Sequence, residues 1–338
     1  MPEGIIGDGM SPRKVRVSIG TAAVLGLAEY RLDAKPTTAY LMTYTDSSCA
    51  ANCAFCPQAR ENSSNKTLLS RVFWPDFPIE EVFKGLRWAT DSLERVCIQA
   101  INYPGFLEDV VYLLKGVKEG TNLPVSLDAP PLGIREMKKL KSTGLEHISV
   151  PLDAATPEIF DRVKGRLSNG PYRWEKHIEA LKTAVEVFDK GKVMSNLIVG
   201  LGETEREAVS LIQLLRDMDV QTALFAFTPV PGTALADLSP PHLEAYRRVQ
   251  LARHLITKGL THFKDMEFDG AGRLKSFGAD SVVVKSGIIG EALRTSGCPG
   301  CNRPYYNERP SGPLYNYPRV LTSEEMHKEA MLMGIDVE

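Results

Sequence analysis

The stretch Cys49-Ala-Ala-Asn-Cys53-Ala-Phe-Cys56 places three thiols within eight residues, so a single loop can fold them around one soft metal centre. Four-iron clusters normally take four cysteines, and a three-cysteine loop therefore leaves one iron without a protein ligand. That iron is free to hold a molecule that reacts. The alternative is a zinc knuckle that lacks its fourth ligand, but no histidine follows at zinc-finger spacing.

The spacing of this loop, with the aromatic Phe55 just before its last cysteine, resembles the signature of the radical S-adenosylmethionine (SAM) superfamily. The resemblance implies a 4Fe-4S cluster whose open iron binds the amino and carboxyl groups of SAM. Electron transfer from a donor such as ferredoxin would then cleave SAM to a 5'-deoxyadenosyl radical.

The composition is typical of a soluble globular protein, with 338 residues, 43% hydrophobic content and a formal net charge of -2. This charge gives no indication of nucleic-acid binding. No stretch supplies the roughly twenty apolar residues of a membrane span. The six cysteines are clustered, and the sequence shows no secretory signal, which indicates metal binding in a reducing cytoplasm rather than disulfides.

The chain repeats a unit of amphipathic helix, polar turn and short apolar strand, which predicts parallel strands with right-handed crossovers. Strands are expected at 39–44, 95–101, 124–127, 147–152, 192–199 and 222–228, and helices at 79–91, 106–119, 133–143, 172–188, 203–218 and 241–258. A doubly wound sheet would also bury such strands. We predict an α/β fold with a TIM-type (β/α) barrel, full or partial, because the candidate site residues follow strand ends.

Three regions are expected. Residues 1–35 form an extension with a short helix at 17–27, and residues 36–264 form the barrel core. Residues 265–338 form a C-terminal region with short strands near Leu274 and at 281–285 and a last helix from Ser323.

Several strand ends resemble the SAM-binding segments of biotin synthase. The resemblance implies that Asp153 binds the ribose of SAM, that Arg166 pairs with its carboxylate, and that the backbone near Ile198 and Gly200 lies along the adenine. Asp153 has an alternative role as the cap of a helix at 156–163, and Arg166 as a solvated surface charge.

The remaining cysteines are Cys97 and the pair in Cys298-Pro-Gly-Cys301. The pair lacks the strand-to-helix context of a redox dithiol, which favours metal binding. Two thiolates are too few for a cluster, and Cys97 is the only cysteine left, although taken alone it would be an inert core residue. We predict an auxiliary iron-sulfur cluster of the 4Fe-4S type on these three cysteines. Resemblance to single-chain lipoyl synthases, which use a serine ligand, implies Ser296 or Ser311 as a candidate fourth ligand, and resemblance to biotin synthase, which uses an arginine, implies Arg273.

The segment around Cys97 resembles biotin synthase, but the other auxiliary cysteines of that family would fall near Ser126 and Ser195. The relocated Cys298–Cys301 pair resembles the biotin-synthase-related proteins of the two-protein lipoyl synthase system. This implies sulfur insertion into an octanoyl chain on a lipoyl carrier protein or H protein, with a second radical SAM protein as partner. The alternatives are a biotin-synthase-like sulfur insertase or a methyl or methylthio transferase on a small molecule, or a non-catalytic iron-sulfur or zinc scaffold.

Overall fold

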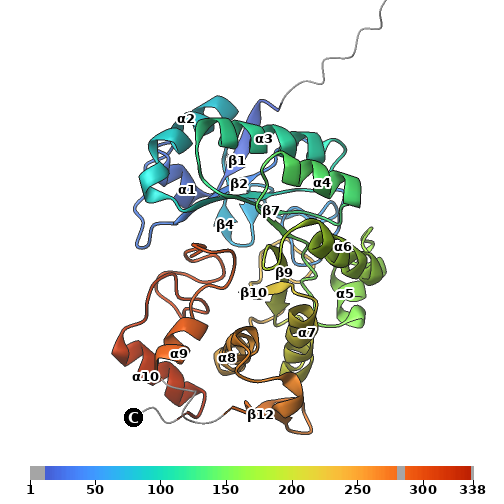
Figure 1. Ribbon diagram of the computed structural model, residues 1–338, viewed down its shortest axis with the longest axis vertical. Coiled ribbons are helices and arrows are strands. Elements are labelled where there is room, and N and C mark those ends of the chain that lie inside the picture. The colour runs from blue at the N-terminus through green and yellow to red at the C-terminus, as the bar shows by residue number, and fades with distance from the viewer. Residues whose placement is uncertain (1–11, 280–285, 336–338) are drawn as a thin grey trace, which may run out of the picture.

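A computed structural model describes residues 12–279 and 286–335 (Figure 1). Its main sheet has eight strands in the order β10-β9-β8-β7-β6-β2-β1-β5. Two strands on one side run antiparallel to their neighbours, namely β1 (Lys14–Val17) and β5 (Asp76–Pro78). The other six are parallel: β2 (Thr38–Met42), β6 (Arg95–Gln99), β7 (Val125–Asp128), β8 (His147–Ser149), β9 (Val193–Val199) and β10 (Gln221–Ala226).

Helices cover the outer face of this sheet because each presents an apolar stripe to it. Figure 1 shows α2, α3 and α4 lying together over the strands on the β1 side. The helices of the core are α1 (Ile19–Val24), α2 (Ile79–Trp88), α3 (Phe106–Gly120), α4 (Ile134–Ser142), α5 (Pro157–Val163), α6 (Trp174–Val187), α7 (Glu205–Asp217) and α8 (Leu243–Lys258), with 3-10 turns at Thr90–Ser92, Arg166–Ser168 and Phe263–Asp265.

The described strands form a partial rather than a closed barrel, since the strand order ends in β10 on one side and in β5 on the other. Along β6, Val96 and Ile98 are fully buried in the core, whereas Cys97 and Gln99 line the interior cavity. This alternation follows from the two-residue period of a strand, which sends successive side chains to opposite faces. The polar residues of the strands therefore gather on the inside of the barrel.

The C-terminal region spans the open side of the barrel. After α9, Ser296 Oγ accepts a hydrogen bond from the backbone N–H of Leu224 on β10, at 2.8 Å. Further along, Asn302 Oδ1 accepts from the backbone N–H of Thr37, just before β2, at 3.0 Å. The tail thus bridges the two ends of the parallel strand set.

Two small hairpins and two helices complete the structure. Helices α9 and α10 lie beside α8, and the buried Arg247 on α8 pairs with Glu329 on α10 at 2.7 Å (Figure 1). These elements are β3 (Leu68–Leu69), β4 (Val72–Phe73), β11 (Glu267–Phe268), β12 (Leu274–Ser276), α9 (Ser286–Ala292) and α10 (Ser323–Leu332).

The six predicted parallel strands and the alternating helices are confirmed. The predicted helix at 17–27 is shorter, because Val17 belongs to β1 and Ser18 caps α1. The strand near Leu274 and the helix from Ser323 are present, the latter with a capping box at Thr322. The strand predicted at 281–285 lies outside the described residues. No helix among the described residues is long and apolar enough to cross a membrane.

Candidate active site

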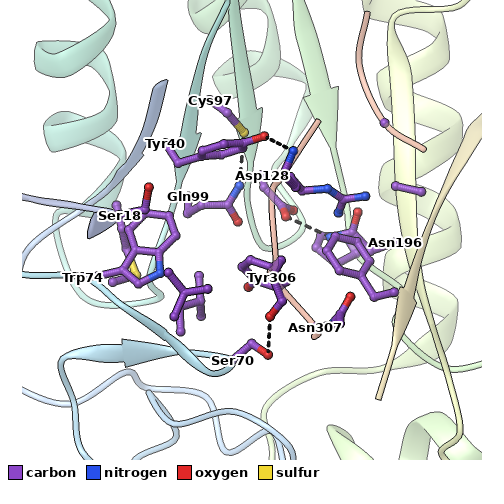
Figure 2. Close-up of a pocket in the computed structure, with 18 of the residues that line it drawn as sticks. Ser18, Tyr40, Ser70, Trp74, Cys97, Gln99, Asp128, Asn196, Tyr306 and Asn307 are labelled. Atoms are coloured by element: carbon purple, nitrogen blue, oxygen red, sulfur yellow. Dashed lines mark hydrogen bonds between the residues drawn. The ribbon is translucent and has the colours of Figure 1, made fainter. Parts of the chain in front are cut away.

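A cavity of about 550 Å³ opens at the carboxyl ends of the parallel strands and extends into the barrel interior. All six cysteines line it. Figure 2 shows side chains from several strands and from the C-terminal tail converging on this space, among them Tyr40, Gln99, Asp128, Asn196 and Tyr306. The cysteines that the sequence groups as a loop, a single strand residue and a tail pair therefore share one chamber.

The loop bearing Cys49, Cys53 and Cys56 follows β2 and is fixed by backbone hydrogen bonds. The N–H of Ala50 donates to the Asn102 carbonyl at 2.6 Å, and the N–H of Ala54 donates to Val163 at 2.7 Å. Burial raises the pKa of all three thiols, that of Cys56 to about 12. Because buried thiols are neutral at ordinary pH, these residues become thiolates when a metal supplies the compensating positive charge.

Asp153 and Lys164 form a buried ion pair at the cavity wall. The Lys164 ammonium donates to Asp153 Oδ2 at 2.6 Å and to the Pro151 carbonyl at 2.8 Å. Burial acts to lower the pKa of Lys164, but its neighbours, first among them the Asp153 carboxylate, outweigh burial and the net pKa is raised. The alternative role of Asp153 as a helix cap is wrong, because Thr156 caps α5.

The cation at this point of the cavity is Lys164, whereas the sequence analysis assigned Arg166 to the SAM carboxylate. Arg166 is exposed in the 3-10 turn after α5 and does not line the cavity. The two residues are separated only by Gly165, and the backbone there turns so that Lys164 enters the barrel. The structure therefore does not support the predicted role of Arg166.

Phe55 and Ile198 both line the cavity, as a role beside SAM requires. Gly200 lies at the end of β9 with φ +108°, and a Cβ there would stand 2.8 Å from Pro241 Cδ. A side chain at this position would therefore be strained and crowded. Its backbone N–H donates to Glu203 Oε1 at 2.5 Å. Adenine binding along this segment stays a prediction.

Cys97, Cys298 and Cys301 meet deeper in the barrel. Gln99 Nε2 lies 3.1 Å from Cys97 Sγ, Ser126 Oγ donates to Cys298 Sγ at 3.2 Å, and the Tyr40 hydroxyl lies 3.4 Å from Cys301 Sγ. Burial raises the pKa of Cys97, and that of Cys298 to about 11. The structure thus brings together the trio that the sequence assigned to an auxiliary cluster, and cluster binding there stays a prediction.

None of the three candidate fourth ligands lines the cavity. Ser296 is buried and accepts the Leu224 N–H, so its hydroxyl serves to fasten the tail to β10. Ser311 is exposed in a turn. Arg273 is exposed in the β11–β12 hairpin, with its guanidinium 4.0 Å from Glu244. Arg303, by contrast, lines the cavity, and its guanidinium stacks 3.8 Å from the Phe225 ring centroid.

Within residues 12–279 and 286–335, no three His, Cys, Asp or Glu side chains converge closely enough to hold a single metal ion. In a four-iron cluster each thiolate binds a different iron, so the thiols of a trio stand farther apart than the ligands of one zinc ion.

Several cavity residues were not found by sequence reasoning. Asp128 on β7 accepts a hydrogen bond from Asn196 Nδ2 at 2.9 Å, and burial raises its pKa to about 7 (Figure 2). Lys164, Trp74 and Tyr306 also face the cavity. A usable signal existed for Asp128, because it directly follows the strand predicted at 124–127, but Trp74 and Tyr306 lie in irregular segments without a periodic pattern.

Residues 46–215 match the family model of the Radical SAM superfamily, half of the chain and the part that carries the cysteine loop, Asp153 and Ile198. The chain belongs to the radical SAM superfamily. Membership implies that Cys49, Cys53 and Cys56 hold a 4Fe-4S cluster with SAM, which when bound supplies a 5'-deoxyadenosyl radical.

This radical SAM protein is similar to biotin synthases. The biotin synthase of Synechococcus sp. (strain CC9605) is 27% identical over 275 residues, which cover 77% of each chain. That of Clostridium acetobutylicum is 24% identical over 257 residues, covering 74% of each. The structure of the FeFe-hydrogenase maturase HydG from Carboxydothermus hydrogenoformans superposes with a TM-score of 0.51 at 14% identity, over 65% of this chain and 51% of that one. This last likeness concerns the fold alone.

Proposed function

We propose that this radical SAM enzyme inserts sulfur, as a lipoyl synthase component that acts on an octanoyl chain carried by a protein. The observation that carries the proposal is the presence of two cysteine trios in one cavity, Cys49, Cys53 and Cys56 at the strand ends and Cys97, Cys298 and Cys301 farther inside. The first trio serves radical formation. The second would hold a cluster whose sulfide becomes the inserted sulfur.

Cys49, Cys53 and Cys56 would hold the cluster that with SAM supplies a 5'-deoxyadenosyl radical, which would take a hydrogen atom from an aliphatic carbon and become 5'-deoxyadenosine. Cys97, Cys298 and Cys301 would hold the cluster that supplies the inserted sulfide and accepts the one electron released when the carbon–sulfur bond forms. The chain itself supplies the walls that orient the substrate and exclude water, including the buried aromatic residues Tyr40 and Trp74.

The position of the second trio supports a departure from biotin synthase. Ser126 stands where biotin synthase would have a cluster cysteine, but here its hydroxyl donates a hydrogen bond to Cys298 Sγ. The tail cysteine therefore occupies the space beside Ser126. Ser195 is fully buried and hydrogen-bonded to the backbone at Val150 and Leu152. Neither serine is free to act as the missing cysteine ligand.

A second candidate is sulfur insertion into a small molecule in the manner of biotin synthase, which the 27% identity over 77% of each chain favours. The proposal prefers a protein-borne substrate because the tail-borne pair Cys298 and Cys301 resembles that of the two-protein lipoyl synthase system. That substrate would require a lipoyl carrier or H protein, a second radical SAM protein as partner, and an electron donor such as ferredoxin.

The test is anaerobic incubation of the reconstituted enzyme with SAM, dithionite and an octanoyl-lysine peptide, with and without a candidate partner protein. Clusters are rebuilt with isotopically labelled sulfide. The proposal predicts 5'-deoxyadenosine and a peptide carrying labelled sulfur. The Cys298→Ala, Cys301→Ala variant should still form 5'-deoxyadenosine but add no sulfur. Thiolation of dethiobiotin alone would establish the second candidate instead, and absence of 5'-deoxyadenosine from the unaltered enzyme would contradict both.

A further inference from the structure

Tyr40, Cys97 and Ser126 lie side by side on the inner face of the sheet. The strands β2, β6 and β7 are parallel neighbours, and their register pairs Tyr40 with Cys97 and Cys97 with Ser126. All three side chains line the cavity. Residues paired across parallel strands point to the same face, so the pleat itself produces this row. The middle position carries a thiol, and both flanking positions carry a hydroxyl.

The C-terminal tail lays its cysteine pair across this row. Cys298 meets one end of it, where the Ser126 hydroxyl donates to Cys298 Sγ at 3.2 Å. Cys301 meets the other end, where the Tyr40 hydroxyl lies 3.4 Å from Cys301 Sγ. Each tail thiol therefore has a hydroxyl of its own from the sheet.

The third thiol of this trio has a donor from its own strand. Gln99 Nε2 lies 3.1 Å from Cys97 Sγ (Figure 2). In the described part of the chain, hydrogen bonds to the loop cysteines come only from backbone N–H groups, such as that of Ala51, which lies 3.4 Å from Cys49 Sγ. Side-chain donors are thus a feature of the second trio and not of the first.

A second bond directs the proton of each hydroxyl at the sulfur. The backbone N–H of Arg303 donates to the Tyr40 oxygen at 2.9 Å, and Arg95 Nη1 donates to Ser126 Oγ at 3.0 Å. A backbone N–H and a guanidinium can only donate, so each hydroxyl oxygen accepts that bond and keeps its own proton for the sulfur. A thiolate that ligates a metal has no proton, so Tyr40 supplies the proton between itself and a ligating Cys301.

We propose that the Tyr40 and Ser126 hydroxyls, with the Gln99 amide, raise the reduction potential of the auxiliary cluster, an inference that rests on the proposed function. Adding one electron to an iron-sulfur cluster increases the negative charge on its sulfurs. An O–H or N–H dipole directed at a ligating sulfur stabilises that charge. The three donors therefore favour the electron-accepting role that the proposed function gives to this site.

The experiment is a redox titration with dithionite, followed by electron paramagnetic resonance, of reconstituted protein in which the three loop cysteines are alanine. Only the auxiliary cluster remains in this background. Tyr40→Phe and Ser126→Ala should each lower the one-electron reduction equilibrium constant of that cluster about tenfold, the usual effect of one hydrogen bond to a charged group. This is a fall of about 59 mV in midpoint potential. Gln99→Leu should shift the potential in the same direction.

Tyr103→Phe is the matched control. Tyr40 and Tyr103 are both 8% exposed and pack in the same apolar cluster, but the Tyr103 hydroxyl donates to Asp109 Oδ2 at 2.6 Å. Removing the Tyr103 hydroxyl should leave the potential of the auxiliary cluster unchanged. A second readout is the magnetic coupling of exchangeable deuterons to the reduced cluster in heavy water. One such coupling should be lost in Tyr40→Phe and kept in Tyr103→Phe.

Unchanged potentials in both Tyr40→Phe and Ser126→Ala would overturn the inference and leave the proposed function standing. Loss of iron from both variants would also overturn it, because the hydroxyls would then hold the cysteine turn rather than set the potential. A background protein that binds no cluster would overturn the inference together with the auxiliary cluster of the proposed function.

Discussion

Replacing Arg95 by methionine should detach the cysteine turn of the tail while leaving the loop at Cys49 intact. Arg95 is 3% exposed at the beginning of β6. Its Nε donates to the Pro299 carbonyl at 3.2 Å, and its Nη1 donates to Ser126 Oγ at 3.0 Å. Ser126 in turn donates to Cys298 Sγ. One buried guanidinium therefore fixes the Cys298–Cys301 turn both directly and through Ser126.

The cost can be estimated from these bonds. Hydrogen bonds to charged groups contribute about 1.5–3 kcal/mol each. The partner carboxylate Glu146 keeps Lys192 at 2.7 Å and is partly exposed, so the substitution leaves no unpaired buried charge. Loss of the two bonds that hold the turn should cost roughly 3 kcal/mol, which lowers the ratio of docked to undocked tail about a hundredfold.

The assay is iron and sulfide content after anaerobic reconstitution. Arg95→Met is placed in a background with Cys49, Cys53 and Cys56 changed to alanine, so that remaining iron reports the auxiliary site. In this background, Arg95→Met should reduce the bound iron to a small fraction of the amount bound with Arg95 intact. The same change in a Cys97, Cys298 and Cys301 to alanine background should leave iron unaltered. Lys192→Met, which removes the other cation on Glu146, is the matched control and should spare both sites. Full iron retention by Arg95→Met would refute this reasoning.

Two further substitutions test buried charges. Asp153→Asn leaves the Lys164 ammonium, which is 4% exposed, without its partner, and should lower the free energy of unfolding in urea by about 3–5 kcal/mol. Adding Lys164→Met should recover part of this loss. An unchanged urea midpoint for Asp153→Asn would contradict the pairing. Burial raises the pKa of Glu308 from 4.5 to about 7. The folded chain therefore binds the Glu308 proton more tightly than the unfolded chain does, and the free energy of unfolding falls as the pH rises from about 4.5 to 7. Between pH 4.5 and pH 8 the free energy of unfolding of Glu308→Gln should therefore rise by on the order of 3 kcal/mol relative to that of the unaltered chain. Equal urea midpoints for the two proteins at pH 8 would contradict this.

The core fold could be predicted because its strands are buried on both faces and its helices carry one apolar stripe. Both patterns leave a periodic signal, which is why strands such as β6 and β9 lie where expected. β1 and β5 were missed because four and three residues are too short for a period. Their antiparallel pairing depends on contacts between residues such as Val15 and Phe77, far apart in the sequence.

The cysteine ligands of the candidate site could be predicted, because the number and grouping of the cysteines limit how they can combine. Six cysteines in three groups leave few ways to form two trios, and the structure places both around one cavity. The choice between Lys164 and Arg166 was not predictable, because it depends on how the backbone turns after α5. Trp74 and Arg303 gave no signal either, since each enters the cavity from an irregular segment whose path is fixed by tertiary contacts.

The central claim is that this chain holds two clusters, one on each cysteine trio. Iron analysis with Mössbauer spectroscopy of three anaerobically reconstituted proteins tests it most directly: the unaltered chain, a Cys49, Cys53 and Cys56 to alanine variant, and a Cys97, Cys298 and Cys301 to alanine variant. We expect about eight irons in the first and about four in each variant, with SAM perturbing the spectrum only where the Cys49 loop is intact. A Cys49, Cys53 and Cys56 variant that binds no iron would contradict the account.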